Sequence, residues 1–339
     1  MEKNSQEKKV RLGVVGCGSI SYGHINRFLN IPEVDLVALV DVKQDKIKRV
    51  QEKIFSHREQ KILVFNDYER MLSKVNLDAV AIFTPHTLHF PQVMQALEKN
   101  LHVLVEKPMV TKTDEAKEII EEAKNKKRVV LVSYQLRYEP VYKYARKIME
   151  EKKIGDIQFI SALITQDWRE GLKRTNRLWR LDPELSGGGM LMDSGSHLLD
   201  ILLWLSNLVP EKVYSLLENK GEKVDINSAI SIRFNNSVLG SISVIGDDHH
   251  HWELSIWGSQ GNLFLRDNKV YIQNKEGAIL KPQNLPSASD PDTNFIRAIL
   301  EDKEVISPPE DALKVTILTQ AIYQSASLGK EVKAKEDEI

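Results

Sequence analysis

Between Val10 and Val132 the chain alternates short, almost wholly apolar runs with longer amphipathic stretches. The apolar runs are rich in β-branched residues: VRLGVVG, VDLVALVD, LDAVAIFT, LHVLVEK and RVVLVSY. Such runs are typical of parallel strands that helices cover on both faces. The stretches between them, such as FPQVMQALEKN and TKTDEAKEIIEEAKNK, repeat apolar positions about every 3.6 residues and predict helices. Strict alternation of strand and helix predicts a doubly wound parallel sheet.

After about residue 150 the pattern changes to strand-like runs separated by short breaks. The runs are DIQFISALIT, KVYSLLEN, INSAISIRF, SVLGSISVIG, HWELSIWGS, NLFLRD and KVYIQN. Apolar and polar residues alternate from Ile230 to Phe234, which indicates a strand with one buried face. The breaks at 235–236 and 267–268, Asn-Asn and Asp-Asn, favour hairpin turns.

The two patterns together predict an α/β protein of two domains. The first is a Rossmann doubly wound parallel sheet over residues 8–132, and the second is an α+β domain over residues 133–330 with a large open, mostly antiparallel sheet. The last helix, 308–328, is expected to pack back on the first domain. Ser307 and Glu310 are expected to form its capping box, with Pro308 in its first turn and Gly329 at its end.

Composition and net charge limit the kinds of molecule that the protein could bind. The chain is 42% hydrophobic and 28% charged, as in an ordinary globular protein, and its formal net charge of −1 gives no general attraction to nucleic acid or anionic lipid. The N-terminal MEKNSQEKKV lacks the apolar stretch of a secretory signal, and HLLDILLWL is too short to span a membrane. The single cysteine, Cys17, fits a reducing compartment. We therefore expect a cytoplasmic protein whose partner is a small molecule.

The first predicted strand leads into a glycine turn, VGCGSISYGH. Gly16 allows a tight turn, and Gly18 removes a side chain where a pyrophosphate must approach the backbone. The helix that follows would point its N-terminal N–H groups at the phosphates. Ser21, another small residue, stands in place of the third glycine. The structural alternative is a turn that binds nothing.

The second predicted strand ends in Asp41, which Val42 and Lys43 follow. A carboxylate at this point accepts hydrogen bonds from ribose hydroxyls and repels a 2′-phosphate. We therefore predict NAD as the cofactor, while Lys43 leaves use of NADP open.

Motifs in this order resemble the Gfo/Idh/MocA oxidoreductases, a family that includes glucose–fructose oxidoreductase and inositol dehydrogenase. They are GCGSISYGH, TPHTLH after the third strand, EKP after the fourth, RYEP, and GGGMLMDSGSHLLD. The resemblance implies a nucleotide domain followed by an α/β domain whose open sheet often builds oligomer interfaces, hence a homodimer or homotetramer. It also implies a cis bond before Pro108, which would hold Lys107 beside the nicotinamide.

The resemblance assigns catalysis to Lys107, Asp193 and His197. A neutral histidine can take the hydroxyl proton as a hydride leaves, and an ammonium group can stabilise the developing alkoxide. The aspartate would bind a neighbouring hydroxyl or orient the imidazole. Asp193 and His197 are four residues apart, so we expect them on one helical face. The structural alternative is a helix whose Asp and His merely satisfy one another.

The residues expected at the cofactor come from the glycine turn, the end of the second strand, TPHTLH and EKP: Gly16, Gly18, Ser19, Ile20, Asp41, Val42, Thr84, Pro85, His86, His89, Glu106 and Lys107. The residues expected at the substrate come from RYEP, from the segment QDWREGLKRTNRLWR and from the glycine-led helix: Arg137, Tyr138, Trp168, Arg169, Trp179, Arg180, Asp193 and His197. The tryptophans could stack on a sugar ring, and Arg169 and Arg180 could bind an anionic group. Arg174 and Arg177 are expected instead to pair with acidic neighbours or to reach a subunit interface. Glycines 187–189 would let the backbone pass close to cofactor or substrate.

The sequence DDHHHW places three histidines in a row, which on a strand point to alternate faces and cannot all bind one ion. No metal site is predicted. We predict an NAD-dependent dehydrogenase that oxidises a secondary alcohol of a sugar, cyclitol or sugar derivative. Two alternatives stay open: a glycosidase that uses NAD transiently, and a non-catalytic sugar or nucleotide sensor.

Overall fold

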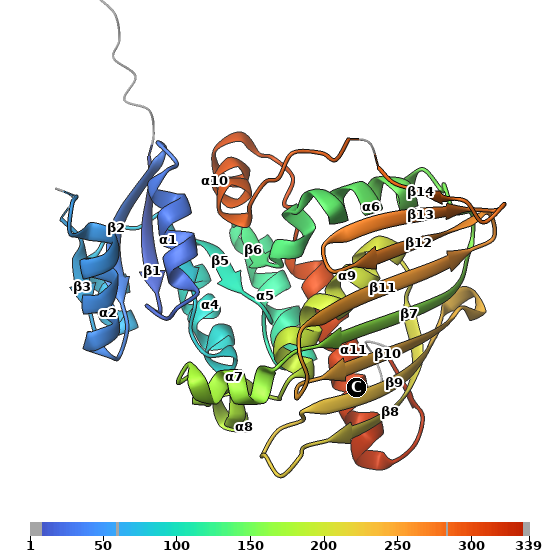
Figure 1. The fold of residues 1–339 in the computed structure, drawn as a ribbon. Coiled ribbons are helices and arrows are strands. Elements are labelled where there is room, and N and C mark those ends of the chain that lie inside the picture. Colours follow the sequence, from blue (N-terminus) through green and yellow to red (C-terminus); the bar gives the residue numbers. More distant parts are fainter. Residues whose placement is uncertain (1–8, 59–60, 283, 335–339) are drawn as a thin grey trace, which may run out of the picture.

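Two sheets organise the molecule, as Figure 1 shows for the computed structural model, which describes residues 9–58, 61–282 and 284–334. The first sheet has six strands in the order β3-β2-β1-β4-β5-β6, all pairs being parallel. These strands are β1 Val10–Val15, β2 Val34–Val40, β3 Leu63–Phe65, β4 Ala79–Ile82, β5 His102–Glu106 and β6 Val130–Ser133. The predicted doubly wound sheet is therefore confirmed.

Helices connect the strands of this sheet: α1 Ser21–Leu29, α2 Gln44–Val50, α3 Tyr68–Lys74, α4 His89–Glu98 and α5 Thr113–Lys126. Strand order reverses between β1 and β4, so the carboxyl ends of these strands border a crevice where open α/β sheets bind ligands. The glycine turn follows β1, and TPHTLH follows β4. The topology thus brings two of the motifs to one edge.

The second sheet has nine strands in the order β14-β13-β12-β11-β7-β10-β9-β8-β15. They are β7 Ile157–Thr165, β8 Pro210–Glu218, β9 Asn227–Phe234, β10 Leu239–Ile245, β11 His251–Gly258, β12 Gly261–Arg266, β13 Lys269–Asn274, β14 Ile279–Leu280 and β15 Val332–Lys333. Among the described strands, β7 and β10 pair in parallel and the other neighbours are antiparallel. The mostly antiparallel sheet predicted for this half is confirmed.

One face of the second sheet is covered and the other is open. Three helices, α6 Pro140–Glu150, α9 Ser196–Ser206 and α11 Pro309–Leu328, pack against strands of this sheet (Figure 1). Along β9, Ile230, Ile232 and Phe234 are buried while the residues between them are exposed. The predicted hairpin turns are present, with left-handed φ values at Asn236, Asp267 and Asn268 of 58°, 43° and 63°.

The end of the chain returns to the first sheet. Helix α10, Pro291–Glu301, packs against α1, β5 and β6, and α11 packs against α5 as well as β8. Between the two sheets lie the short helices α7 Trp168–Arg174 and α8 Pro183–Ser186 (Figure 1). No helix among the described residues is long and apolar enough to cross a membrane.

The start of α11 differs from the expectation. The helix begins at Pro309, and Pro308 is extended with ψ of 161°. A residue before proline is disfavoured in the α region, so the double proline moves the helix start one residue on. The expected capping box is absent, because the Ser307 hydroxyl is buried without a hydrogen-bond partner among the described residues. Gly329 ends the helix with φ of 61°, as predicted.

Candidate active site

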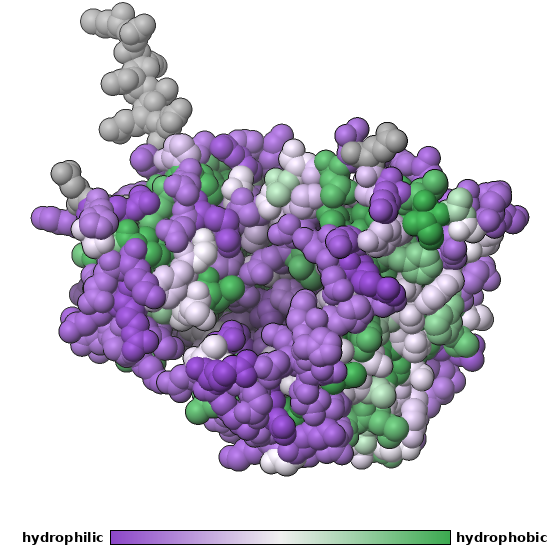
Figure 2. Space-filling model, viewed as in Figure 1, coloured by the Kyte–Doolittle hydropathy of each residue, from purple (hydrophilic) through white to green (hydrophobic). Residues whose placement is uncertain are grey.

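A cavity of about 1290 Å³ runs from the glycine turn to α7 and α9. Figure 2 shows this face hollowed between the two halves of the molecule. Residues of both halves line it, so the cavity is a single space shared by the first sheet and the helices that cover the second.

The glycine turn forms one end of the cavity. Gly16 has φ of +91°, and a Cβ there would stand 2.7 Å from the carbonyl oxygen of Phe83, so the turn requires glycine. A Cβ on Gly18 would meet nothing within 4 Å, and Gly18 lines the cavity. The Ser21 hydroxyl donates to the Gly18 carbonyl at 2.7 Å at the start of α1. These residues fit a dinucleotide, because the space that a side chain would fill at Gly18 is left for a phosphate.

Asp41 lies at the same end. Its Oδ2 accepts the backbone N–H of Cys17 at 2.8 Å, its Oδ1 accepts that of Lys43 at 2.8 Å, and Lys46 Nζ is 3.9 Å from Oδ2. These contacts fix the carboxylate at the wall of the cavity, where a ribose hydroxyl could reach its remaining lone pairs.

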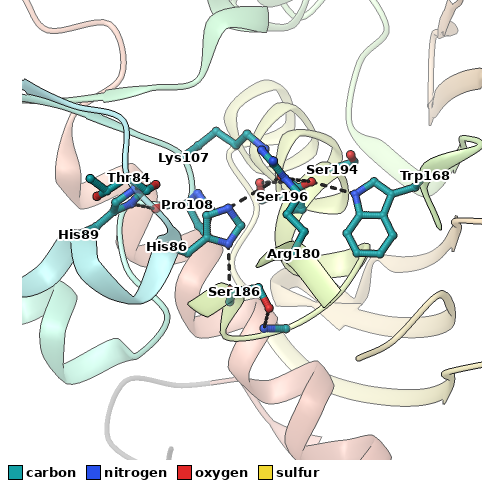
Figure 3. A network of polar contacts seen from close by, with 12 residues as sticks. Thr84, His86, His89, Lys107, Pro108, Trp168, Arg180, Ser186, Ser194 and Ser196 are labelled. Atoms are coloured by element: carbon teal, nitrogen blue, oxygen red, sulfur yellow. Dashed lines mark hydrogen bonds and ion pairs between the residues drawn. The ribbon is translucent and has the colours of Figure 1, made fainter. Parts of the chain in front are cut away.

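Lys107 enters the cavity from the carboxyl end of β5. The Lys107–Pro108 peptide bond is cis, as the resemblance implied. Lys107 Nζ donates to the backbone oxygen and to Oδ1 of Asp193, each at 2.9 Å (Figure 3). An ammonium group has three donors. One N–H of Lys107 therefore remains for a ligand in the cavity.

Asp193 holds several groups together. Its Oδ2 accepts Trp168 Nε1 at 2.8 Å and Arg180 Nε at 2.8 Å, and its Oδ1 lies 3.9 Å from His86 Nε2. Burial opposes its charge, but the Arg180 guanidinium and the Lys107 ammonium outweigh it and hold the pKa of Asp193 well below its usual range. Asp193 is therefore an anion whose carboxylate already accepts hydrogen bonds from Lys107, Trp168 and Arg180.

A π-helical turn, Leu191–Gly195, precedes α9, and the Gly195 N–H donates to the Met190 oxygen at 2.8 Å. Asp193 lies within this turn and His197 in the α-helix that follows it, and both side chains line the cavity. No hydrogen bond joins the Asp193 carboxylate to the His197 imidazole among the described residues, so Asp193 neither orients the imidazole nor forms a satisfied pair with it. His197 Nδ1 is buried with no hydrogen-bond partner among the described residues.

The two histidines of the cavity are neutral at physiological pH. Burial, reinforced by the Lys107 ammonium, lowers the pKa of His197 to about 3. Burial is also the largest cause that lowers the pKa of His86 to about 3. His86 Nδ1 lies 2.9 Å from the Ser186 oxygen, and its ring meets Trp179 edge-on at 4.9 Å. His197 thus offers a neutral imidazole, the form that can accept a proton.

The sequence was compared with known families and proteins. Residues 10–134 match the oxidoreductase family with an NAD-binding Rossmann fold, and residues 142–264 match the GFO/IDH/MocA C-terminal domain. The chain belongs to the Gfo/Idh/MocA oxidoreductases. It is therefore an NAD(P)-binding oxidoreductase.

Relatives cover almost the whole chain. A D-xylose 1-dehydrogenase [NADP(+)] of Haloarcula marismortui is 23% identical over 98% of this chain and 95% of its own length. A myo-inositol 2-dehydrogenase of Thermotoga maritima is 25% identical over 79% of each chain. The WlbA dehydrogenase of Bordetella pertussis, solved with NADH and UDP-GlcNAcA, is 23% identical and matches with a TM-score of 0.82 over 96% of this chain and 98% of its own.

The structure brings most of the predicted Gfo/Idh/MocA site residues to this one cavity. Of the cofactor set, the following line it: Gly16, Gly18, Ser19, Ile20, Asp41, Val42, Thr84, Pro85, His86, Glu106 and Lys107. Of the substrate set, the following line it: Trp168, Trp179, Arg180, Asp193 and His197. His89 instead lies behind the wall, where its ring nitrogens are 2.8 and 2.9 Å from the carbonyl oxygens of Pro108 and Thr84 (Figure 3).

Arg137 and Tyr138 do not reach the cavity. Each is 1% exposed. Arg137 binds Asp200 at 2.6 Å and Asp311 at 2.7 Å, and the Tyr138 hydroxyl donates to Asn294 at 2.9 Å. Arg137 thus joins α9 to α11, and Tyr138 contacts α10. Arg137 has two carboxylate partners because a buried guanidinium requires pairing. Their predicted contact with the substrate is therefore wrong.

The glycines at 187–189 approach protein rather than ligand. A Cβ on Gly189 would lie 1.9 Å from the Asp225 oxygen, and one on Gly187 would lie 2.4 Å from the Thr111 side chain. The Asp225 carboxylate accepts the N–H groups of Gly189 and Leu191 at 2.7 and 2.9 Å. These glycines therefore let the start of α9 dock on the loop before β9.

The arginines of the α7 segment separate into different environments. Arg174 pairs with Asp167 at 2.5 Å, as expected. Arg169 is absent from the cavity lining and donates to the Lys220 oxygen at 3.3 Å. Arg177 lines the cavity, although the sequence favoured an ion pair for it.

Sequence reasoning missed some cavity residues. Gln166 and Ser194 line it and are joined by a 2.9 Å hydrogen bond, and Gln135 lines it beside Glu106. Ser194 lies within GGGMLMDSGSHLLD and Gln166 begins QDWREGLKRTNRLWR, so their places in these segments were the available signals. Within the described residues, no group of three His, Cys, Asp or Glu side chains could hold a metal ion.

Proposed function

We propose that the protein is an NAD-dependent dehydrogenase that oxidises a secondary alcohol of a sugar, cyclitol or sugar derivative. The observation that carries this proposal is that Lys107 from the first sheet and His197 from α9 line the same cavity as the glycine turn. The names of the relatives, which include dehydrogenases of xylose and myo-inositol, support a polyhydroxylated substrate.

Each side chain has a part in the proposed reaction. The neutral imidazole of His197 accepts the hydroxyl proton of the substrate. The remaining N–H of Lys107 donates to the same oxygen and stabilises the charge that develops on it. Asp193 fixes the position of Lys107 through two hydrogen bonds rather than binding the substrate itself. The bound nicotinamide would supply the hydride acceptor.

We assign NAD rather than NADP as the preferred cofactor. The carboxylate of Asp41 lines the cavity after β2, where it can bind ribose hydroxyls and repel a 2′-phosphate. The glycine turn and the start of α1 would hold the pyrophosphate.

A panel of neutral and acidic sugars, inositols and nucleotide-sugars tests the proposal by the absorbance of NADH. Alcohol-dependent formation of NADH is expected. Cleavage of glycosides without net NADH would indicate the glycosidase instead. Tight NAD binding with no turnover on any member of the panel would indicate a sensor.

A further inference from the structure

The substrate end of the cavity has more positive charge than negative. Lys107, Arg177 and Arg180 line it, and Asp193 pairs with Lys107 and Arg180. Two other carboxylates of the lining have partners of their own: Asp167 pairs with Arg174 at 2.5 Å, and Glu106 lies 3.0 Å from His24. With the imidazoles of His86 and His197 neutral, nothing else in the lining at this end offsets the cations.

Of these three cations, Arg177 is the one that forms no ion pair with a carboxylate among the described residues. Its Nε donates to the neutral Thr175 hydroxyl at 2.8 Å, and it makes no ion pair within the part of the chain that the structure describes. Burial and the neighbouring Arg180 guanidinium lower its pKa. A guanidinium has five N–H donors, so the outer fork of Arg177 is left for a planar or tetrahedral anion.

The backbone holds Arg177 in place at the end of α7. Its N–H donates to the Leu172 oxygen at 2.9 Å, and Asn176 before it has a left-handed φ of 53°. The side chain therefore starts from a fixed point on the cavity wall. An arginine held in this way loses little freedom when it binds an anion.

We propose that Arg177 binds an anionic substituent, a carboxylate or a phosphate, on the substrate, so that the site prefers acidic sugar derivatives to neutral sugars. This inference rests on the proposed function. Arg180 has a different part, because Asp193 occupies its Nε at 2.8 Å and its guanidinium lies over the Trp179 ring at 4.4 Å. Arg177 thus discriminates between substrates, whereas Arg180 holds Asp193 and the Trp179 ring in place.

The test compares matched neutral and anionic sugars: glucose with glucuronate and with glucose 6-phosphate, and galactose with galacturonate. Binding to the NADH complex is measured by calorimetry, and turnover by NADH absorbance, for the native protein, Arg177→Gln and Lys173→Gln. The native protein should favour at least one anion over its neutral counterpart. Arg177→Gln should lower that anion-to-neutral ratio roughly 10- to 100-fold, the usual effect of a lost charge-assisted hydrogen bond.

Lys173→Gln removes an equal charge from the same segment, and its partners Glu170 and Glu222 lie outside the cavity lining, so the ratio should stay unchanged. A preference for carboxylates over the phosphate, or the reverse, identifies the anion. No preference for any anion, an equal change of the ratio in both variants, or a loss of NADH binding in Arg177→Gln equal to the loss of anion binding would overturn the inference. Anion binding without oxidation of any sugar would instead contradict the proposed dehydrogenase and leave the anion site supported.

Discussion

The charge of each side chain in this site depends on its own burial and its own neighbours. Asp193 keeps its charge because two cations and an indole contact it, and it gives Lys107 a fixed position. His197, on α9, has no such anchor and remains neutral because burial and the Lys107 ammonium disfavour its protonated form. An ammonium donor and a neutral acceptor thus coexist in one cavity.

The pKa of His197 predicts an unusual pH dependence. An ordinary histidine gains its proton near pH 6.5, but His197 is expected to stay neutral down to about pH 3. Because kcat/KM reports the free enzyme, its value should stay level as the pH falls through 6.5. The profile between pH 4 and 8 checks this, with NADH binding followed over the same range to detect unfolding. An acid limb centred at 6.5 with binding intact would refute the neutral imidazole.

Asp41 makes a prediction about cofactor choice. Asp41→Ala removes the ribose acceptor and the charge that repels a 2′-phosphate, while Lys43 and Lys46 remain nearby. The NAD-to-NADP ratio of kcat/KM should fall about 10-fold or more, as for a lost hydrogen bond to a charged group. Titration with 5′-AMP and 2′,5′-ADP checks the binding part without turnover. An unchanged preference between these two nucleotides would remove Asp41 from the ribose contact.

At the scale of elements, buried His24 joins three parts of the fold. From α1, its Nε2 lies 3.0 Å from Glu106 at the end of β5 and its Nδ1 lies 2.6 Å from Asp292 in α10. Burial opposes protonation, but Asp292 and Glu106 outweigh it and raise the pKa of His24 to about 9. The imidazolium therefore ties the strand that carries Lys107 to the returning C-terminal helix.

This tie predicts that stability falls in mild alkali. The folded-state pKa lies above the ordinary 6.5, so the contribution is complete below pH 6.5 and is lost as the pH rises through about 9. The loss should approach about 3 kcal/mol in the free energy of unfolding. Denaturant unfolding at pH 6, 7.5 and 9 measures it, with His24→Gln as the control that should lose much of the dependence. Identical pH dependence in both proteins would show that His24 does not titrate in this window.

The degree of burial decided which helices and strands could be predicted from the sequence. Strands β1, β2, β4, β5 and β6 were predicted because their side chains are nearly all buried and apolar. Strand β3 was missed because it is a three-residue edge strand whose side chains are exposed or half-buried. The π-helical turn before α9 was missed because spacing arguments assume 3.6 residues per turn. Most site residues in the motifs were predicted correctly, but the prediction failed at Arg137 of RYEP, because its partners come from distant parts of the chain.

At the scale of the whole molecule, the open face of the second sheet is expected to join two copies. Neighbouring strands place Ser161, Ser231 and Ser241 in one row of small side chains, of which Ser231 and Ser241 are exposed. Beside that row lie the rings of Phe159, Trp257 and Phe264, with centroids 5.7 and 6.1 Å apart along the series. Leu239, 45% exposed, pairs with Phe159 across the strands. An apolar face of this kind is typical of an interaction surface.

Leu239→Arg tests this surface. A charge beside these aromatic rings should be buried without a partner on association, so the variant should dissociate into monomers. Size-exclusion chromatography with light scattering measures the mass. Leu63→Arg, at an exposed residue of β3 in the first sheet, is the matched control and should keep the native mass. A native protein that is monomeric at micromolar concentration would contradict the expected homo-oligomer.

The central claim is that Lys107 and His197, from the two halves of the molecule, act on one hydroxyl. A double-mutant cycle of Lys107→Ala and His197→Ala measures this, using the best alcohol of the panel and confirming that NADH still binds. Each single variant should lose roughly 10²- to 10⁴-fold in kcat/KM, and the double variant should be little slower than the worse single one. Losses that multiply in the double variant would show that the two side chains act independently and would contradict the account.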